Sequence, residues 1–114
     1  MKTDFLSCII YNDNGWKIAD SAGHTQHNVA GVSVVNGNIV ISFKPMDVRN
    51  VLNFSVSNDE EMALAGVMAG ASVGFTQATI KIARLVNGAM QQVDANNLNV
   101  ANGNFFVSGL FEIY

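Results

Sequence analysis

The chain has 114 residues, of which 49% are hydrophobic and only 13% are charged, with a formal net charge of −3. A disordered chain would show the opposite bias, and the six Lys and Arg residues are spread along the sequence, which excludes the clustered basic surface of a nucleic-acid-binding protein. The length fits one domain, residues 1–114, and the low charge indicates either an Asn- and Ser-rich surface or a surface covered by other subunits.

The first apolar run, residues 5–11, predicts a strand, and Cys8 lies within it. As the only cysteine, Cys8 cannot form an intramolecular disulfide, and we expect it to be a small buried hydrophobic residue. A nucleophilic thiol needs a base and an electropositive setting, and neither is visible near Cys8 in the sequence.

The same run does not have the pattern of a signal peptide, because Asp4 precedes it and Asn12 ends it. The longest apolar stretch, residues 62–75, is too short to cross a membrane and is rich in Gly and Ala. The sequence therefore predicts synthesis in the cytoplasm without a signal peptide and no membrane span.

Four Asn-Gly pairs punctuate the sequence, at residues 14–15, 36–37, 87–88 and 102–103. Asn-Gly between apolar runs is typical of a two-residue hairpin loop, because both central residues of a type I′ turn need a positive φ. Since a two-residue loop fixes the register, each pair predicts which residues face each other.

At the first pair, this register sets Tyr11 opposite Ile18 and Ile10 opposite Ala19, and it brings Tyr11 and Trp16 onto one face. Two aromatic rings on one face, with polar neighbours, could form a platform for a sugar. The alternative is a hydrophobic patch that caps the core near the turn, or an interface anchor.

The other three pairs predict hairpins with sharper patterns. The second pair sets Val35 opposite Asn38 and extends to Ala30 opposite Phe43, with one face entirely apolar. The third pair extends from Leu85/Met90 to Lys81/Asp94, where opposite charges face each other. The fourth pair sets Val100 opposite Phe105 and Leu98 opposite Val107.

Between the hairpins, residues 48–57 and 66–75 are expected to be strands, and Pro45 marks the end of the strand before them. Acidic residues at the start of residues 58–64 predict a short helical turn. We expect the small residues 66–74 to lie where another backbone approaches closely. The chain is therefore predicted to be all-β, a jelly-roll-like β-sandwich of about eight strands with Asn-Gly hairpins, with a small β-barrel as the alternative.

The most suggestive polar run is residues 20–27, in which His24 and His27 are three positions apart. They could ligate a metal or line a binding site, although a solvated loop with two ordinary histidines is the simpler interpretation. There is no Gly-x-Ser-x-Gly elbow, and the acidic residues 59–61 are more typical of a helix N-terminus than of paired catalytic carboxylates. We therefore predict no catalytic residue and no cofactor, and whether the two histidines bind a metal stays open.

The C-terminal run, residues 102–114, reads NGNFFVSGLFEIY. It resembles the last strand of trimeric jelly-roll domains of the tumour-necrosis-factor and complement-C1q type, and the Asn-rich, low-charge texture resembles small β-domains of bacteriophage fibres and tips. The resemblance implies a homotrimer that adheres to a host-surface glycan or protein or decorates a capsid, placing the protein in the virion. The resemblance also implies an interface or core position for five residues: Phe105, Phe106, Gly109, Leu110 and Phe111.

Three non-enzymatic functional hypotheses follow, while the sequence supports an enzyme only through the loop that carries His24 and His27. The first is a virion structural or adhesion protein that acts through oligomeric assembly. The second is a monomeric carbohydrate- or protein-binding module that uses Tyr11, Trp16, His24 and His27. The third is an inhibitor or immunity-type protein that blocks a partner. The mass in solution separates the first hypothesis from the others.

Overall fold

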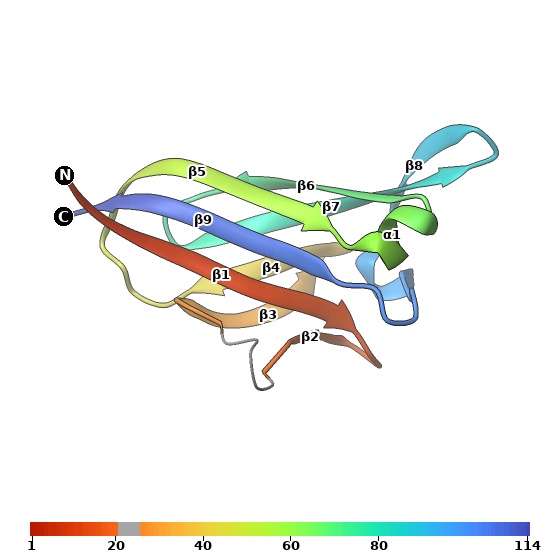
Figure 1. The fold of residues 1–114 in the computed structure, drawn as a ribbon, viewed down its shortest axis with the longest axis horizontal. Helices are drawn as coiled ribbons and strands as arrows, with labels where there is room; N and C mark the ends of the chain where they lie inside the picture. Colours follow the sequence, from red (N-terminus) through yellow and green to blue (C-terminus); the bar gives the residue numbers. More distant parts are fainter. Residues whose placement is uncertain (21–25) are drawn as a thin grey trace.

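The protein is a sandwich of two antiparallel sheets, seen in a computed structural model that describes residues 1–20 and 26–114 (Figure 1). The molecule is elongated, with principal extents of 47 × 31 × 23 Å. The prediction of an all-β sandwich is confirmed. The alternative, a closed barrel, is wrong, because each sheet keeps two open edges.

One sheet has the strand order β2-β1-β9-β5, and the other has the order β3-β4-β7-β6, with β8 paired to the distal part of β7. The elements are β1 (Lys2–Asn12), β2 (Trp16–Ile18), β3 (Val29–Val35), β4 (Asn38–Phe43), β5 (Val48–Asn58), α1 (Glu60–Leu64), β6 (Val67–Val73), β7 (Gln77–Val86), β8 (Ala89–Val93), the 3-10 turn η1 (Ala95–Asn97) and β9 (Phe105–Ile113).

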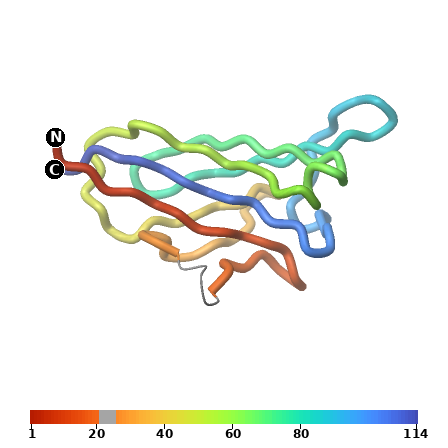
Figure 2. Tube along the Cα trace, viewed as in Figure 1, coloured from red at the N-terminus to blue at the C-terminus, as the bar shows by residue number. Residues whose placement is uncertain are grey.

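The chain crosses between the sheets after β2, β4, β5 and β8 (Figure 2). β1 and β9 pair along almost their whole lengths, from Lys2↔Ile113 to Ile10↔Phe105. The two termini therefore lie together at one end of the molecule, while α1 and the turn between β1 and β2 lie at the other (Figure 1).

The core lies between the sheets and follows from the alternation of side chains along the strands. In β9, alternate residues from Phe105 to Phe111 are buried and those between them are exposed. The largest fully buried side chains come from both sheets, from α1 and from the residue after η1: Phe105, Phe111, Leu6, Ile10, Ile39, Ile41, Met62, Ile80, Ile82 and Leu98.

Two of the predicted hairpins form in the predicted register. Asn36-Gly37 and Asn87-Gly88 both have a positive φ at each residue, as type I′ turns require. In the first of them the pairing runs from Val35↔Asn38 to Gly31↔Ser42, and a bulge at its end makes Val29, rather than Ala30, the partner of Phe43.

The predicted cross-strand charge pair in the β7–β8 hairpin does not form. β8 ends at Val93, and the Asp94 side chain accepts a hydrogen bond from the backbone N–H of Asn96 at 2.9 Å. Asp94 thus caps η1 instead of facing Lys81, because the cap satisfies a backbone donor that would otherwise have no partner.

The fourth Asn-Gly pair is a turn, but the predicted hairpin is wrong. Asn102 has φ 62° and the N–H of Gly103 donates to the carbonyl of Val100 at 2.9 Å, as in a type II turn with Asn at its third position. Phe105 begins β9, which lies between β1 and β5. It therefore pairs with Ile10 of β1 and Asn58 of β5 rather than with Val100.

The expected helical turn forms as α1, and Asp59 connects it to the start of β9. One carboxylate oxygen of Asp59 accepts from the N–H of Met62 at 3.0 Å. The other accepts from the backbone N–H and the side-chain amide of Asn104, both at 2.9 Å.

Asp59→Ala is expected to lower the free energy of unfolding by about 2 kcal/mol, because it removes a helix cap and leaves Asn104 donors without their acceptor. The measurement is urea unfolding. Glu60→Ala is the control: its side chain is exposed on the same turn, and we expect a loss below about 0.5 kcal/mol. Similar losses for both variants would contradict this role of Asp59.

Candidate functional site

The first hairpin has a three-residue loop, and its predicted register is wrong by one residue. The observed pairs are Asn12↔Trp16, Tyr11↔Lys17 and Ile10↔Ile18. Asn12 sets the longer loop, because its side-chain oxygen accepts from the N–H of Gly15 at 3.0 Å. A one-residue slip moves a side chain to the other face of a sheet, so Tyr11 and Trp16 lie on opposite faces and do not form one platform.

Trp16 is a core residue. Its ring is buried and stacks on Phe105 with 5.8 Å between ring centroids and an interplanar angle of 12°. The indole Nε1–H donates to the carbonyl of Ala95 at 2.9 Å, which satisfies its polar atom. Tyr11 faces the other way and lies half-buried at the molecular surface.

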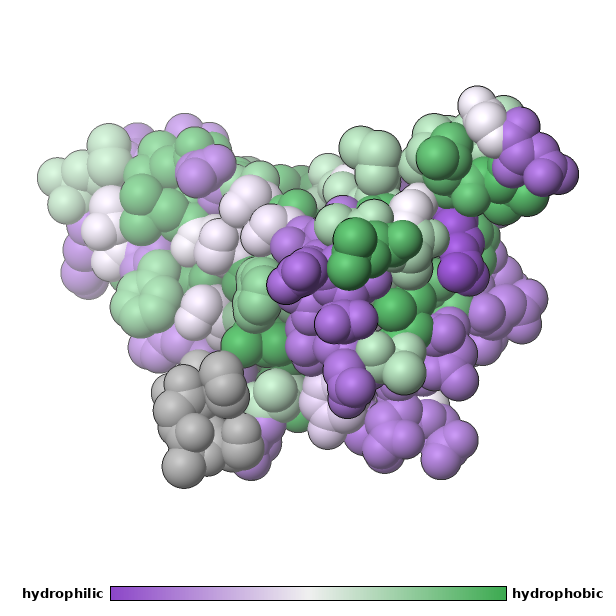
Figure 3. All heavy atoms as spheres, turned by 45° about the vertical axis from the view of Figure 1, so that its right-hand side comes forward, coloured by the Kyte–Doolittle hydropathy of each residue, from purple (hydrophilic) through white to green (hydrophobic). Residues whose placement is uncertain are grey.

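An open groove of about 850 Å³ lies beside Tyr11, at the end of the molecule away from the termini. Its apolar lining includes Ile9, Tyr11 and Phe106 from the paired strands β1 and β9, together with Ala19, Val100 and Ala101. The polar part comes from two segments far apart in sequence, Asn12, Asp13 and Asp20 near the first hairpin and Asn99, Asn102 and Asn104 before β9. Figure 3, which turns this end forward, shows hydrophilic residues gathered over its lower part.

The Asn side chains of the groove fall into two groups. Asn12 donates to the carbonyl of Leu98, and Asn104 donates to Asp59, so these two amides are held in place. Among the described residues, none forms a hydrogen bond with the side-chain amide of Asn99 or Asn102; the backbone carbonyl of Asn102 accepts from the Asn104 amide at 3.2 Å. The groove therefore combines fixed amides with amides that can turn toward a ligand.

Among the described lining residues, the charges are acidic, on Asp13 and Asp20. Lys17 lies 3.8 Å from Asp13, but both side chains are largely exposed, so this ion pair contributes little. Two carboxylates and no basic residue in the described lining favour neutral or cationic ligands over anions.

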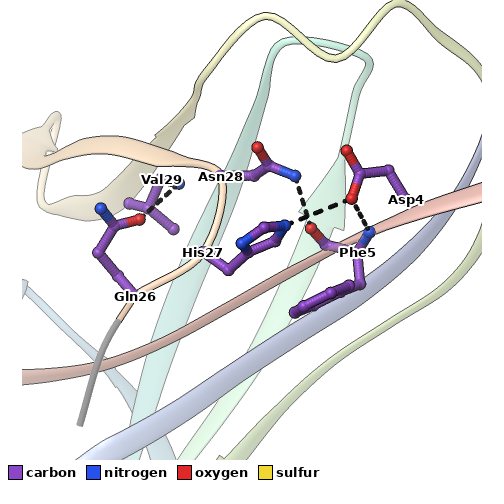
Figure 4. A network of polar contacts seen from close by, with 6 residues as sticks. All are labelled: Asp4, Phe5, Gln26, His27, Asn28 and Val29. Carbon is purple, nitrogen blue, oxygen red and sulfur yellow. Dashed lines mark hydrogen bonds and ion pairs between the residues drawn. The ribbon is translucent and has the colours of Figure 1, made fainter.

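His27 packs against β1 (Figure 4). Its backbone exchanges hydrogen bonds with Ser7, at 2.8 and 3.1 Å. Its ring stacks on Phe5 with 4.0 Å between centroids, and its Nε2 lies 3.4 Å from the nearer carboxylate oxygen of Asp4. The neighbouring Asn28 amide donates to the carbonyl of Phe5 at 2.8 Å.

These contacts lower the pKa of the Asp4 carboxyl group. The backbone N–H of Phe5 donates to the Asp4 carboxylate and lowers its pKa, with smaller contributions from Asn28 and His27. A lowered pKa means that the interaction stabilises the fold above the usual titration range of Asp and is lost as the pH falls through the lowered value.

The other predicted histidine, His24, lies outside the residues that the structure describes. Within residues 1–20 and 26–114, no His, Cys, Asp or Glu side chains form a group of three or more that could hold a metal ion. The sequence-based question of a metal shared by His24 and His27 is therefore not answered by the geometry.

Cys8 is buried in the core, as expected. Burial raises the pKa of its thiol to about 12. At neutral pH the side chain is an uncharged thiol packed among apolar neighbours, without the thiolate that nucleophilic chemistry needs.

The residues of β9 that the resemblance carried over fall on two faces. Phe105, Gly109 and Phe111 point into the core, whereas Phe106 and Leu110 point outward. Outward residues of β1 and β5 join them in a surface that we call the β9 face: Phe5, Ser7, Leu52, Asn53, Ser55, Ser57, Phe106, Ser108 and Leu110.

The β9 face exposes large apolar side chains, and the charge on the same side of β9 lies at its end near the termini, where Glu112 pairs with Arg49 at 3.7 Å. Phe5 is 50%, Leu110 42%, Phe106 41% and Leu52 40% exposed. Ser55 and Ser108 lie between them, with 3.1 Å between their hydroxyl oxygens. Phe106 lies at the border between this face and the groove.

Sequence reasoning missed Phe5, Leu52, Asn99 and Asn102. The run of residues 5–11 carried a usable signal, because apolar residues at consecutive positions of a strand must occupy both faces. For Asn99 and Asn102 no local signal exists, since the groove forms only when β1 and β9 pair.

Among the described residues, no helix has the length and hydropathy that crossing a bilayer requires. Compared with known proteins, the chain matches no family model, no curated protein and no solved structure.

Proposed function

We propose that the protein acts without catalysis, as an oligomeric assembly and adhesion protein of the structural kind found in bacteriophage fibre tips, tails or capsid decorations. The observation that carries this proposal is the apolar β9 face, whose centre around Phe106, Ser108 and Leu110 carries no charge. Exposed apolar patches of this kind are typical of interaction surfaces, and charge is depleted at the cores of interfaces.

The face also has the form that self-association needs. It lies on the paired strands β1, β9 and β5, which hold its side chains in fixed positions. Small serines between the large apolar side chains leave recesses for those of another copy. A homotrimer, with this face toward the threefold axis, agrees with the resemblance of the C-terminal strand.

Leu110→Asp is expected to convert an assembly of about three 12.2 kDa chains into monomers, because a carboxylate at the centre of an apolar interface has no partner there. Multi-angle light scattering on a sizing column measures the mass. Leu110 is exposed in the single chain, so the variant should still fold, and circular dichroism checks this.

Met90→Asp is the matched control, since Met90 is 45% exposed on the protruding β7–β8 hairpin, in the other sheet. It should keep the assembled mass. A wild-type monomer at high concentration would overturn the assembly proposal. If Met90→Asp dissociates the assembly and Leu110→Asp does not, the interface lies on the sheet that carries Met90, and the β9 face is not the interface.

A further inference from the structure

We propose that the groove beside Tyr11 binds a neutral carbohydrate. The inference deepens the proposed function, because it names the class of surface ligand through which adhesion would occur. It depends on three properties of the groove: an apolar floor with an aromatic ring, walls of amides, and the absence of basic residues from the described lining.

The floor suits the apolar face of a sugar ring. Tyr11 is half-buried, so its ring is fixed in the sheet while part of it stays exposed. It lies two residues along β1 from Ile9, which pairs with Phe106 of β9, and all three line the groove. A rigid aromatic surface with apolar neighbours packs against C–H groups at little entropic cost.

The walls suit hydroxyl groups. A hydroxyl both donates and accepts hydrogen bonds, and so does an Asn side chain. Asn99 and Asn102 have no side-chain partner among the described residues that they would have to give up. The turn that carries Asn102 is fixed by the bond from Gly103 to Val100 at 2.9 Å, so this wall is ordered before a ligand arrives.

The charges favour a neutral sugar over an anionic one. Asp13 and Asp20 can accept hydrogen bonds from hydroxyls, but they repel sialic acid, sulfate and phosphate groups. The anionic ligands of basic clefts, nucleic acids among them, are disfavoured for the same reason.

The first experiment applies the full chain to an array of oligosaccharides that end in glucose, galactose, mannose or N-acetylglucosamine, with sialylated and sulfated oligosaccharides as anionic counterparts. The strongest neutral binder is then titrated by calorimetry. Trp16, the only tryptophan, gives a second signal, because it borders a small pocket that shares Asn12 and Asn99 with the groove.

Tyr11→Ala and Asn99→Asp are each expected to weaken binding of that oligosaccharide about tenfold, the size of one lost aromatic or amide contact. The matched controls are Tyr114→Ala, at the opposite end of the molecule, and Asn87→Asp, at the tip of the β7–β8 hairpin. Both controls should bind like the wild type, and circular dichroism confirms the fold of each variant.

The inference is overturned if no neutral oligosaccharide binds, if the anionic members bind better, or if Tyr11→Ala and Asn99→Asp bind as well as their controls. The mass of the wild type and of Leu110→Asp tests the proposed assembly separately from sugar binding. An assembled protein that binds no sugar refutes the groove alone, whereas a monomeric wild type that binds sugar refutes the assembly alone.

Discussion

Phe105→Ala is expected to lower the free energy of unfolding by about 3–5 kcal/mol, the range for truncating a fully buried aromatic side chain. Phe105 is 0% exposed, pairs with Ile10 and Asn58 on its two sides, and stacks on Trp16. The cavity left by the ring is enclosed by both sheets and cannot collapse easily. Urea unfolding measures the loss as a lower midpoint with an unchanged slope.

Its neighbour provides the control. Phe106 carries the same side chain on the same strand but points outward and is 41% exposed. Phe106→Ala should cost less than about 1 kcal/mol in the monomer. If the two alanine variants lost equal stability, the assignment of the two faces of β9, and with it the β9 face, would be wrong.

Gly109→Ala is expected to lower the free energy of unfolding by about 3 kcal/mol, the upper part of the range for overpacking a core. A Cβ atom at this position would lie 2.8 Å from Cδ2 of Phe54 and 2.9 Å from Cε2 of Phe111. These rings pack with Phe43 in one aromatic cluster, at centroid distances of 5.4 to 6.5 Å, so neither can move without disturbing the others.

Gly70→Ala is the contrasting substitution, because a Cβ there meets nothing within 4 Å. Gly70 lies exposed on β6, and the close approach of another backbone that was predicted for residues 66–74 does not occur at this glycine within the chain. This variant should be neutral or more stable by about 0.5 kcal/mol, since alanine restricts the unfolded chain. Differential scanning calorimetry on both variants tests the pair, and a destabilised Gly70→Ala would contradict the open space at β6.

The sequence carried enough local information for the second and third hairpins. In the second hairpin, a two-residue turn and the apolar alternation on both sides required the same register, whereas in the third the two-residue turn alone set it, because the residues of β8 are almost all exposed. At the first hairpin the Asn-Gly pair is present, but the hydrogen bond from Gly15 to the Asn12 side chain adds a residue to the loop. No local pattern distinguishes the two loop lengths there.

The fourth hairpin failed for a non-local reason. Phe105 has two partners, Ile10 and Asn58, that are 95 and 47 residues away, and burial between them outweighs a local hairpin with Val100. The groove was not predictable for the same reason, because its two walls meet only through the pairing of β1 with β9. The C-terminal strand itself, and the residues on it that carry the two faces, were identified from the sequence.

The position of the termini determines how the protein can be presented. The Lys2 ammonium lies 3.3 Å from the carbonyl oxygen of Tyr114, so both ends leave the fold at one point, while the groove opens at the far end. A biotin or polyhistidine tag at either terminus would therefore hold the molecule on a sensor surface with the groove directed into solution. Coupling through lysine amines offers no such control, because Lys17 lies next to Asp13 and would anchor part of the population by the groove itself.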